Sequence, residues 1–405
     1  MDLIILGQGY VGLPLAVNAA KSGIKVYGFD IDINKINRLK LGISESPEVK
    51  NSDLMKLQED KKIEFINQLP KLKESAIFVI AVPTPLLKNR QPDLSMLEKA
   101  CQLISSVVVD GSLIINESTS FIGTLSQFVK PKIDLGSGLM NIDYAVAPER
   151  IDPGNKEWNM QSTPRIVSGI DEKSTRRVFE FYSKFCSQVN IVSKPEVAEA
   201  AKLFENTFRL VNIALVNELS ELSFRFNFST QEAITAASTK PYGFLAFYPS
   251  IGVGGHCIPV DPNYLSYSAE QVGANLDLIH LADKINLEIH QKIVSRIEGL
   301  LGGKLQGKQI QVAGIAYKPN VSDLRESPAL TLIMYLKKLG AFVTWHDPLV
   351  KHWNNENSTL LKSELDLALI VTPHDLIDFS IWKNANVKVL DLSANSNDYG
   401  WPKFL

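Results

Sequence analysis

The sequence predicts an α/β protein in which two doubly wound parallel sheets are joined by one long central helix. Short apolar runs, typical of buried parallel strands, alternate with helical stretches toward both ends of the chain. Between these regions, residues 195–226 carry apolar side chains at helical spacing and contain no internal proline or glycine. The chain has 405 residues, which is enough for about two to three domains with cores of their own.

The first apolar strand leads directly into a glycine-rich turn. Gly7, Gly9 and Gly12 stand where a Rossmann-like dinucleotide fold needs a tight turn, close approach of a pyrophosphate, and packing of helix on strand. The second strand ends at Asp30, at the distance expected for an acid that binds a ribose 2′-hydroxyl. Because a carboxylate there repels a 2′-phosphate, we predict that this domain binds NAD rather than NADP.

Five strands are expected in this N-terminal region, and the later ones end in polar residues. The expected strands are Leu3–Leu6, Lys25–Phe29, Ala76–Val82, Ser112–Asn116 and Tyr144–Ala147. In open α/β sheets, ligands bind at the carboxyl ends of the strands. Thr84, Thr119 and Glu149 follow three of these ends and are therefore candidate site residues. Ordinary loop polarity or helix capping is the alternative interpretation for each of them.

The helix predicted from Pro195 to Phe226 is about 45 Å long, more than one small domain requires. We expect it to connect two domains and to offer a surface for a dimer. Lys202 and Asn206 lie one turn apart on it, an arrangement that can stabilise a negatively charged oxygen. Glu205, beside them, fits a solvated helix face.

The run from Gly252 to Asp261 combines glycines, a thiol and a carboxylate. Cys257 follows His256, and Asp261 stands four residues further on. Glycines bring the backbone close to a ligand, and a thiolate with a nearby carboxylate suits covalent catalysis at sulfur followed by attack of water. The alternative is a buried free cysteine after a glycine turn. His256 is either fixed structurally in the loop or a group that lowers the thiol pKa.

A second βαβ region without a glycine fingerprint follows. A helix from Leu276 to about Leu301 leads into it. The expected elements are strands at Gln309–Ala316, Phe342–His346, Leu365–Thr372 and Val387–Leu392, and a helix at Ser327–Leu339. We assign no role to His346, His352 or His374. The predicted domains are residues 1–194, a central helical domain at 195–300, and residues 301–405.

Composition excludes several classes of function. The net charge of −2 and the absence of a basic run argue against binding of nucleic acid. No stretch reaches about eighteen apolar residues, so we expect no membrane segment. The three cysteines are too few and too scattered for a disulfide framework and indicate reduced thiols in the cytoplasm. No His, Cys and Asp spacing forms a ligand set, so no metal site is expected.

Taken together, these motifs resemble the nucleotide-sugar 6-dehydrogenase family, which oxidises UDP-hexoses to UDP-hexuronic acids. The resemblance extends over nearly the whole chain and follows the order of the family's motifs. The matching segments are Gly7–Gly12, Val82–Pro85, Glu117–Thr119, Pro148–Arg150, Glu199–Asn206, Gly254–Cys257 with Asp261, and Ala316–Arg325.

The resemblance implies two NAD-dependent oxidations in one site. Cys257 would attack the intermediate aldehyde, and the resulting thiohemiacetal would be oxidised to a thioester and hydrolysed. Lys202 and Asn206 match the pair that stabilises the oxygen on C6. Asp261 matches the carboxylate that acts as a base or orients it. Both Lys202 and Asp261, the latter through water, remain candidates for the first proton acceptor.

The resemblance also assigns binding residues. Thr119 and Glu149 match residues that hold the hydrolytic water. Arg325 matches a guanidinium that reaches the cofactor pyrophosphate across the cleft, and Lys35 is either a cation near the adenosine or an exposed helix lysine. The cofactor set is Gly7, Gly9, Tyr10, Val11, Gly12, Asp30, Ile31, Lys35, Val82, Pro83, Thr84, Thr119 and Arg325. The substrate set is Glu149, Arg150, Lys202, Asn206, Phe247, Tyr248, Gly254 and Lys318.

The sugar is expected to be a UDP-N-acetylhexosamine. The segment Ala147–Ile151 and His256 depart from the pattern of UDP-glucose enzymes, and Pro259 favours UDP-N-acetylglucosamine over UDP-N-acetylmannosamine. Arg150 is a candidate partner for the acetamido carbonyl. The resemblance further implies a homodimer and a product used in surface polysaccharide biosynthesis.

Two other classes of function remain open. A two-electron hydroxy-acid or sugar-phosphate dehydrogenase would share the fold but would not need Cys257. A non-catalytic NAD-binding regulatory protein would keep the glycine turn without a use for Lys202, Asn206, Cys257 and Asp261 together.

Overall fold

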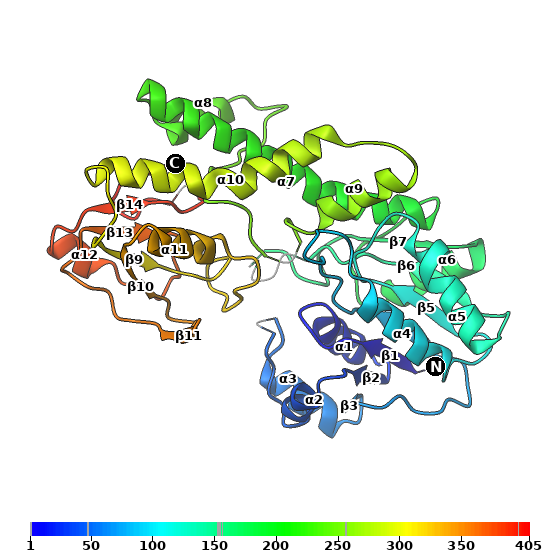
Figure 1. Cartoon of the computed structure of the whole chain (residues 1–405). Helices are drawn as coiled ribbons and strands as arrows, with labels where there is room; N and C mark the ends of the chain where they lie inside the picture. The colour runs from blue at the N-terminus through cyan, green and yellow to red at the C-terminus, as the bar shows by residue number, and fades with distance from the viewer. Residues whose placement is uncertain (1, 47, 152–154, 156, 256, 396) are drawn as a thin grey trace. The chain divides into compact units, whose positions relative to one another are not determined.

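The computed structural model describes residues 2–46, 48–151, 155, 157–255, 257–395 and 397–405. The chain forms two compact units. The first comprises Met1–Glu205 and Asn263–Gly273, and the second comprises Asn206–Pro262 and Ala274–Leu405. Each unit contains a sheet whose strands are mostly or entirely parallel, and the predicted α/β class is confirmed (Figure 1).

The sheet of the first unit has the strand order β3-β2-β1-β4-β5-β6-β7-β8. Its strands are β1 (Leu3–Leu6), β2 (Val26–Phe29), β3 (Ile63–Ile66), β4 (Ile77–Ile80), β5 (Leu113–Asn116), β6 (Asp143–Val146), β7 (Arg165–Gly169) and β8 (Val189–Ile191). All five predicted strands are present, several of them shorter than predicted. Strands β3, β7 and β8 were not predicted from the sequence. Strand β7 runs antiparallel to β6, whereas the other neighbours in this sheet are parallel.

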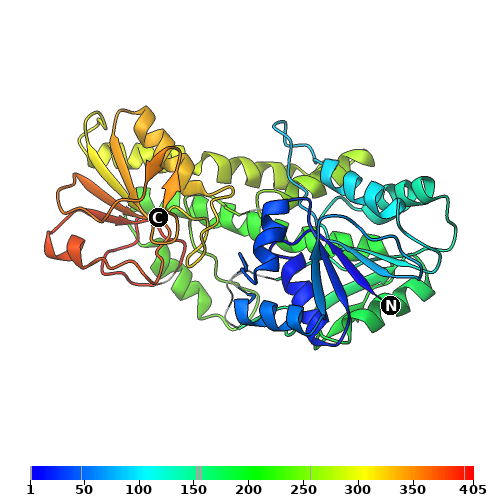
Figure 2. The same cartoon turned by 90° about the horizontal axis from the view of Figure 1, so that it is seen from below.

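Alternating side chains of this sheet enter two separate cores. In β1, Leu3 and Ile5 belong to one core, whereas Ile4 and Leu6 belong to the other. Strands that are buried on both faces read as continuous apolar runs, which is why the pattern was recognisable. Figures 1 and 2 show the strands between two layers of helices.

Helices cover both faces of the first sheet. The first core is completed by α1 (Gly12–Lys21), α2 (Ile33–Lys40), α3 (Asn51–Glu59) and α6 (Glu172–Tyr182). The second core is completed by α4 (Ser95–Ser105), α5 (Lys130–Ser137) and the short π-helix η1 (Leu125–Val129).

The long central helix is α7, Pro195–Phe226, of 32 residues. Its bounds match the prediction, with Pro195 in the first turn, where a missing backbone N–H costs nothing. Three further helices follow along the chain: α8 (Thr230–Ser238), α9 (Asp261–Gln271) and α10 (Asp277–Leu300). Within the described residues, no helix is both long enough and apolar enough to cross a membrane.

The sheet of the second unit has the order β10-β9-β13-β14, with all neighbours parallel. Its elements are β9 (Gln309–Ala313), α11 (Pro328–Lys338), β10 (Phe342–His346), β13 (Leu367–Ile370), α12 (Ser380–Asn384) and β14 (Val389–Asp391), with a small hairpin of β11 (His352–Trp353) and β12 (Glu356–Asn357). Side chains of α10 and α11 pack on one face and those of α12 on the other.

Strand β9 is shorter than the predicted Gln309–Ala316. Gly314 has a φ of +77°, and a Cβ atom there would lie 1.7 Å from the backbone oxygen of Thr372. Only glycine fits this left-handed and crowded position, so the chain leaves the sheet after Ala313. The following residues form a loop at the carboxyl edge of the sheet instead of extending the strand.

Candidate active site

The glycine turn after β1 has the geometry expected of a phosphate-binding loop. Gly7 has a φ of +96°, and a Cβ atom on Gly12 would lie 1.9 Å from the oxygen of Gly7. A Cβ atom on Gly9, in contrast, would meet nothing within 4 Å. Helix α1 begins at Gly12, and Val11 before it supplies no side-chain cap. Uncapped amides beside open space suit an anionic pyrophosphate, so this turn fits a dinucleotide cofactor.

Asp30 is buried at the end of β2 and accepts three hydrogen bonds. Its donors are the backbone N–H of Gln8 at 2.9 Å, the backbone N–H of Asp32 at 3.0 Å, and the Lys35 ammonium at 2.9 Å. Lys35 is therefore an ion-pair partner of Asp30, so the exposed-lysine alternative does not apply. Ile31 is largely exposed. The carboxylate links the glycine turn to β2 and lies where a ribose is expected.

The loops after β4 and β5 are joined by three hydrogen bonds. The Ser118 hydroxyl accepts from the backbone N–H of Val82 at 2.9 Å and donates to the Val82 oxygen at 2.9 Å. The Thr84 hydroxyl donates to the oxygen of Thr119 at 2.5 Å. These hydrogen bonds bring together two loops that were predicted to bind the cofactor. The second loop also carries Thr119, a predicted catalytic residue. Ser118 is a residue that the sequence analysis missed.

Glu199 ties the same region to helix α7. Its carboxylate accepts from the backbone N–H groups of Gly123 at 2.6 Å and Leu125 at 2.9 Å. Burial raises the pKa of Glu199 to about 7, although these two hydrogen bonds oppose the rise. The loop that follows Thr119 is therefore anchored one turn before Lys202 on α7. Lys202 itself is 9% exposed.

Glu149 and Arg150 follow β6 and are both held by other residues. Glu149 accepts from the backbone N–H groups of Arg150 at 2.6 Å and Ile151 at 2.9 Å, and from Arg165 at 2.9 Å. The Arg150 guanidinium forms a two-pronged pair with Glu205, at 2.6 and 3.1 Å. Glu205, expected on a solvated face, therefore fixes a predicted substrate residue.

Cys257, Asp261 and Asn206 are linked in the second unit. The backbone oxygen of Cys257 accepts from the N–H groups of Val260 at 3.1 Å and Asp261 at 2.8 Å, which places the thiol residue one turn before α9. The Asp261 carboxylate is buried and accepts a hydrogen bond from the Asn206 amide at 2.5 Å. A thiol residue, a carboxylate and an amide donor are thus grouped. His256 lies outside the described residues.

The loop around Gly254 packs closely on the loop that carries Arg325. A Cβ atom on Gly254 would lie 2.9 Å from Pro328, and the N–H of Gly255 donates to the oxygen of Arg325 at 3.1 Å. The Arg325 guanidinium is oriented by Asp323, with its Nε 2.9 Å from a carboxylate oxygen. The two loops for which ligand contacts were predicted therefore lie against each other.

Phe247 and Tyr248 were predicted from the same loop region. The Phe247 ring packs edge-on against Phe208 of α7, with ring centroids 5.7 Å apart. Both predicted residues are half-buried. Packing on α7 limits the conformational freedom of the Phe247 side chain.

His374, to which the sequence analysis assigned no role, organises the loop of Lys318. Its Nε2 lies 3.0 Å from the buried Asp347 carboxylate, and its Nδ1 accepts from the backbone N–H of Asn320 at 2.9 Å. Burial alone would raise the pKa of Asp347, but hydrogen bonds from His374 and the N–H of Ile315 lower it below its usual value. His374, Asp347 and Asn320 follow the carboxyl ends of three different strands, so no local sequence pattern could predict their contact.

The predicted site residues belong to both compact units. The cofactor residues other than Arg325, together with Glu149, Arg150 and Lys202, lie in the first; Asn206, Phe247, Tyr248, Gly254, Cys257, Asp261, Lys318 and Arg325 lie in the second. Within the described part of the chain, no group of three or more His, Cys, Asp or Glu side chains is arranged to hold a metal ion.

Comparison with known proteins identifies the family. The UDP-glucose/GDP-mannose dehydrogenase family matches the chain through its NAD binding domain at residues 1–186, its central domain at 196–288 and its UDP binding domain at 311–393. The chain belongs to this family. The protein is therefore an NAD-dependent nucleotide-sugar dehydrogenase, and the predicted resemblance and cofactor are confirmed.

Individual relatives cover almost the whole chain. Protein CapL of Staphylococcus aureus is 36% identical over 92% of this chain and 90% of its own length. A UDP-N-acetyl-D-glucosamine 6-dehydrogenase of Pseudomonas aeruginosa is 35% identical over 86% of this chain and 83% of its own. The solved structure of a UDP-ManNAc dehydrogenase from Pyrococcus horikoshii has a TM-score of 0.88 and 31% identity, covering 99% of this chain and 98% of that one.

The dehydrogenase is expected to lose affinity for NAD when Asp30 is replaced by alanine. The change removes the carboxylate that would bind the ribose and frees the N–H of Gln8, so KM for NAD should rise roughly tenfold to a hundredfold. The matched control is Asp32→Ala. Asp32 caps α2 two residues away, so its loss should lower thermal stability and leave KM for NAD unchanged. An unaltered KM in Asp30→Ala would contradict the assignment.

Proposed function

We propose that this dehydrogenase oxidises the C6 alcohol of a UDP-N-acetylhexosamine, preferentially UDP-N-acetylglucosamine, to the uronate. The observation that carries the proposal is the group formed by Cys257, Asp261 and Asn206. Asn206 donates to the Asp261 carboxylate, and the backbone N–H of Asp261 donates to the oxygen of Cys257. A two-electron dehydrogenase has no use for a thiol in this position.

Cys257 retains the half-oxidised sugar in the proposed reaction. When bound, NAD would supply the hydride acceptor for each of the two oxidations. Cys257 adds to the C6 aldehyde to give a thiohemiacetal, whose oxidation gives a thioester. The covalent bond prevents the aldehyde from escaping between the two steps. Water then cleaves the thioester, releasing the carboxylate and restoring the thiol.

Lys202 and Asn206 stabilise negative charge on the C6 oxygen. They lie one turn apart on α7, so both side chains can donate to the same oxygen atom. Lys202 is buried, and a charged donor acts more strongly there than in bulk water. The proton of the alcohol is accepted by Asp261 through a water while Lys202 is charged, or by Lys202 itself if its amine is neutral at the start of the step.

Thr119, Glu149 and Asp261 serve the hydrolytic step. The backbone oxygen of Thr119 is tied to Thr84, and both carboxylate oxygens of Glu149 accept hydrogen bonds from the protein. Groups fixed in this way can hold a water in line with a thioester at little entropic cost. Asp261 acts as the base or orients it.

The ratio of NADH formed to UDP-sugar consumed tests the proposal. Four-electron oxidation predicts a ratio of two. A ratio of one would favour a simple two-electron dehydrogenase. The absence of NADH with every UDP-sugar, alongside retained NAD binding, would favour a regulatory NAD-binding protein.

The choice of sugar rests on the residues after β6 and around the thiol. Ala147–Ile151 separates the chain from UDP-glucose enzymes, and Pro259 supports UDP-N-acetylglucosamine, while relatives are named for both UDP-N-acetylglucosamine and UDP-N-acetylmannosamine. Arg150, fixed by Glu205, is the proposed partner of the acetamido carbonyl. Comparing kcat/KM for UDP-GlcNAc, UDP-ManNAc, UDP-GalNAc and UDP-glucose tests this choice. A preference for UDP-ManNAc or UDP-glucose would overturn it.

The proposal assigns a different role to each of three segments of the chain. Residues 1–194 bind NAD, residues 195–300 carry the thiol and the dimer surface, and residues 301–405 bind the nucleotide. Lys318, in the loop fixed by His374, contacts the nucleotide sugar, and Arg325 contacts the cofactor pyrophosphate. The enzyme acts in the cytoplasm, in keeping with three free cysteines, and supplies uronate for surface polysaccharides.

A homodimer through α7 is also proposed. Four exposed apolar side chains, Phe204, Phe208, Leu215 and Leu222, are spaced to share one face of this helix. Leu215→Glu places a charge on that face and is expected to shift the molecular mass measured by light scattering from dimer to monomer. Leu376→Glu, at an exposed leucine away from α7, is the control. A monomeric wild type, or a dimeric Leu215→Glu protein, would contradict this interface.

A further inference from the structure

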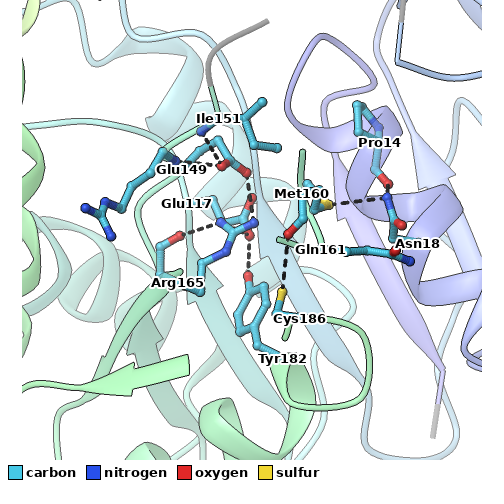
Figure 3. Close-up of polar contacts among 12 residues, drawn as sticks. Pro14, Asn18, Glu117, Glu149, Ile151, Met160, Gln161, Arg165, Tyr182 and Cys186 are labelled. Atoms are coloured by element: carbon cyan, nitrogen blue, oxygen red, sulfur yellow. Dashed lines mark hydrogen bonds and ion pairs between the residues drawn. The ribbon is translucent and has the colours of Figure 1, made fainter. Parts of the chain in front are cut away.

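Four polar side chains form a buried cluster that we call the Arg165 network: Arg165, Glu117, Glu149 and Tyr182. Arg165 lies between the two carboxylates, with Nη2 at 2.9 Å from Glu149 and Nη1 at 3.2 Å from Glu117 (Figure 3). The Tyr182 hydroxyl donates to Glu117, and the guanidinium lies 4.9 Å from the centre of the Tyr182 ring. Glu117, Arg165 and Tyr182 are almost fully buried.

The topology of the sheet explains how this cluster forms. Glu117 directly follows β5, and Glu149 lies three residues beyond β6. Strand β7 is antiparallel to β6 and begins with Arg165, so its first residue lies at the edge where β5 and β6 end. A parallel strand would have placed Arg165 at the opposite edge. The antiparallel pairing of β7 with β6 therefore places the Arg165 guanidinium at the carboxyl edge of the sheet.

The network contains one cation for two carboxylates. Burial raises the pKa of Glu117 to about 7; the Arg165 charge opposes this rise and the Glu149 charge adds to it. Burial also raises the pKa of Tyr182 well above its usual value. Burial alone would lower the pKa of Arg165, but Glu149 and Glu117 raise it, so the guanidinium stays charged. When Glu117 is protonated, the charge of Arg165 is matched by Glu149 alone.

Both oxygens of Glu149 are anchored. One accepts the backbone N–H groups of Arg150 and Ile151, and the other accepts from Arg165. The backbone donors belong to the loop that carries Glu149, whereas Arg165 belongs to a strand of the sheet. Among the described residues, Arg165 is therefore the group that ties this carboxylate to the sheet.

We propose that Arg165 is a positioning residue that fixes the Glu149 carboxylate for thioester hydrolysis. This inference rests on the proposed function, in which Glu149 holds the water that attacks the Cys257 thioester. Arg165 acts through Glu149 and takes no part in the two oxidations. Its loss should therefore slow one step of the cycle and leave the earlier ones in place.

The test separates hydrolysis from oxidation in the full-length enzyme. Arg165→Lys keeps a positive charge but lacks the planar fork that spans both carboxylates. On rapid mixing with NAD and the UDP-sugar that the wild type turns over best, we expect a normal burst of NADH followed by a steady-state rate lowered about 10²-fold. Intact-protein mass spectrometry should show the sugar nucleotide accumulating on Cys257.

Two reference variants separate an effect on hydrolysis from a general loss of stability. Glu149→Gln should show the same burst and the same adduct, because it alters the group that Arg165 positions. Arg296→Lys is the matched control, since Arg296 is also buried, pairs with Glu221 at 2.7 Å, and lies 4.5 Å from the centre of the Phe224 ring. It should lose thermal stability without accumulating the adduct.

Several outcomes would overturn the inference. If Arg165→Lys lowers burst and steady-state rate together without an adduct, Arg165 has only a structural role. If Glu149→Gln accumulates the adduct and Arg165→Lys hydrolyses it at the wild-type rate, this inference fails while the proposed function stands. If the wild type forms no adduct and one NADH per sugar, the proposed function fails and this inference with it.

A second variant guards against misfolding. If Arg165→Lys does not fold, the double variant Arg165→Met, Glu117→Gln removes one buried carboxylate along with the guanidinium. The same burst and the same adduct are expected. If the double variant hydrolyses the thioester at the wild-type rate, the positioning role of Arg165 is rejected.

Discussion

Replacing Cys257 with alanine is expected to abolish formation of the uronate, with a loss in turnover of more than about 10³-fold. The variant lacks the sulfur that captures the aldehyde, and so neither the thiohemiacetal nor the thioester can form. Cys257→Ser should be similarly impaired, since a serine hydroxyl is a much weaker nucleophile than a thiolate. The turn from Cys257 to Asp261 is held by backbone groups, so neither change should disturb it. NADH formation and product mass measure the effect.

The other two cysteines provide matched controls. Cys101 and Cys186 are both buried, and burial raises the pKa of Cys101 to about 12 and that of Cys186 above its usual value. Thiols of this kind remain protonated and unreactive. Cys101→Ala and Cys186→Ala should therefore keep catalysis, at some cost in core packing. A Cys257→Ala enzyme that still delivers two NADH per sugar would remove the basis of the covalent mechanism.

Elements whose local pattern is unambiguous could be predicted from the sequence. Helix α7 and strand β10 have the predicted bounds, since a continuous helical period marks the helix and a short run of β-branched and aromatic residues marks the strand. Strand β7 was missed. Its first residue is Arg165, and the strand is stabilised by pairing with distant segments. Pairing of this kind leaves no signal within the strand itself.

The same distinction applies to the site. Gly7, Gly9 and Asp30 carry a local signature, whereas the hydrogen bond from Asn206 to Asp261 joins residues 55 positions apart. The resemblance to a family grouped these two, but no spacing rule leads to their contact. His374 was dismissed because the histidines are scattered along the chain. Its role depends on Asp347 and Asn320, which only the folded sheet brings beside it.

Asn206→Ala is expected to produce the second large loss of activity. The amide would stabilise the developing charge on the C6 oxygen and also donates to Asp261. Removal of one such donor typically lowers kcat by about 10²–10³-fold, because the charge develops only in the transition state. KM for the UDP-sugar should change little. Lys202→Met should cause a comparable loss, since both side chains would donate to the same oxygen in the proposed reaction.

Asn217 allows a stringent control on the same helix. It lies eleven residues after Asn206, is 1% exposed, and accepts from the N–H of Ser250 at 2.9 Å while donating to Asn286 at 3.1 Å. Asn217→Ala leaves buried polar groups unpaired and should lower stability by about 1–3 kcal/mol, yet keep kcat at temperatures where the protein stays folded. Asn206→Ala, in contrast, should lose most of its kcat even at temperatures where the protein stays folded. Equal behaviour of the two variants would mean that Asn206 supports the helix and takes no part in the chemistry.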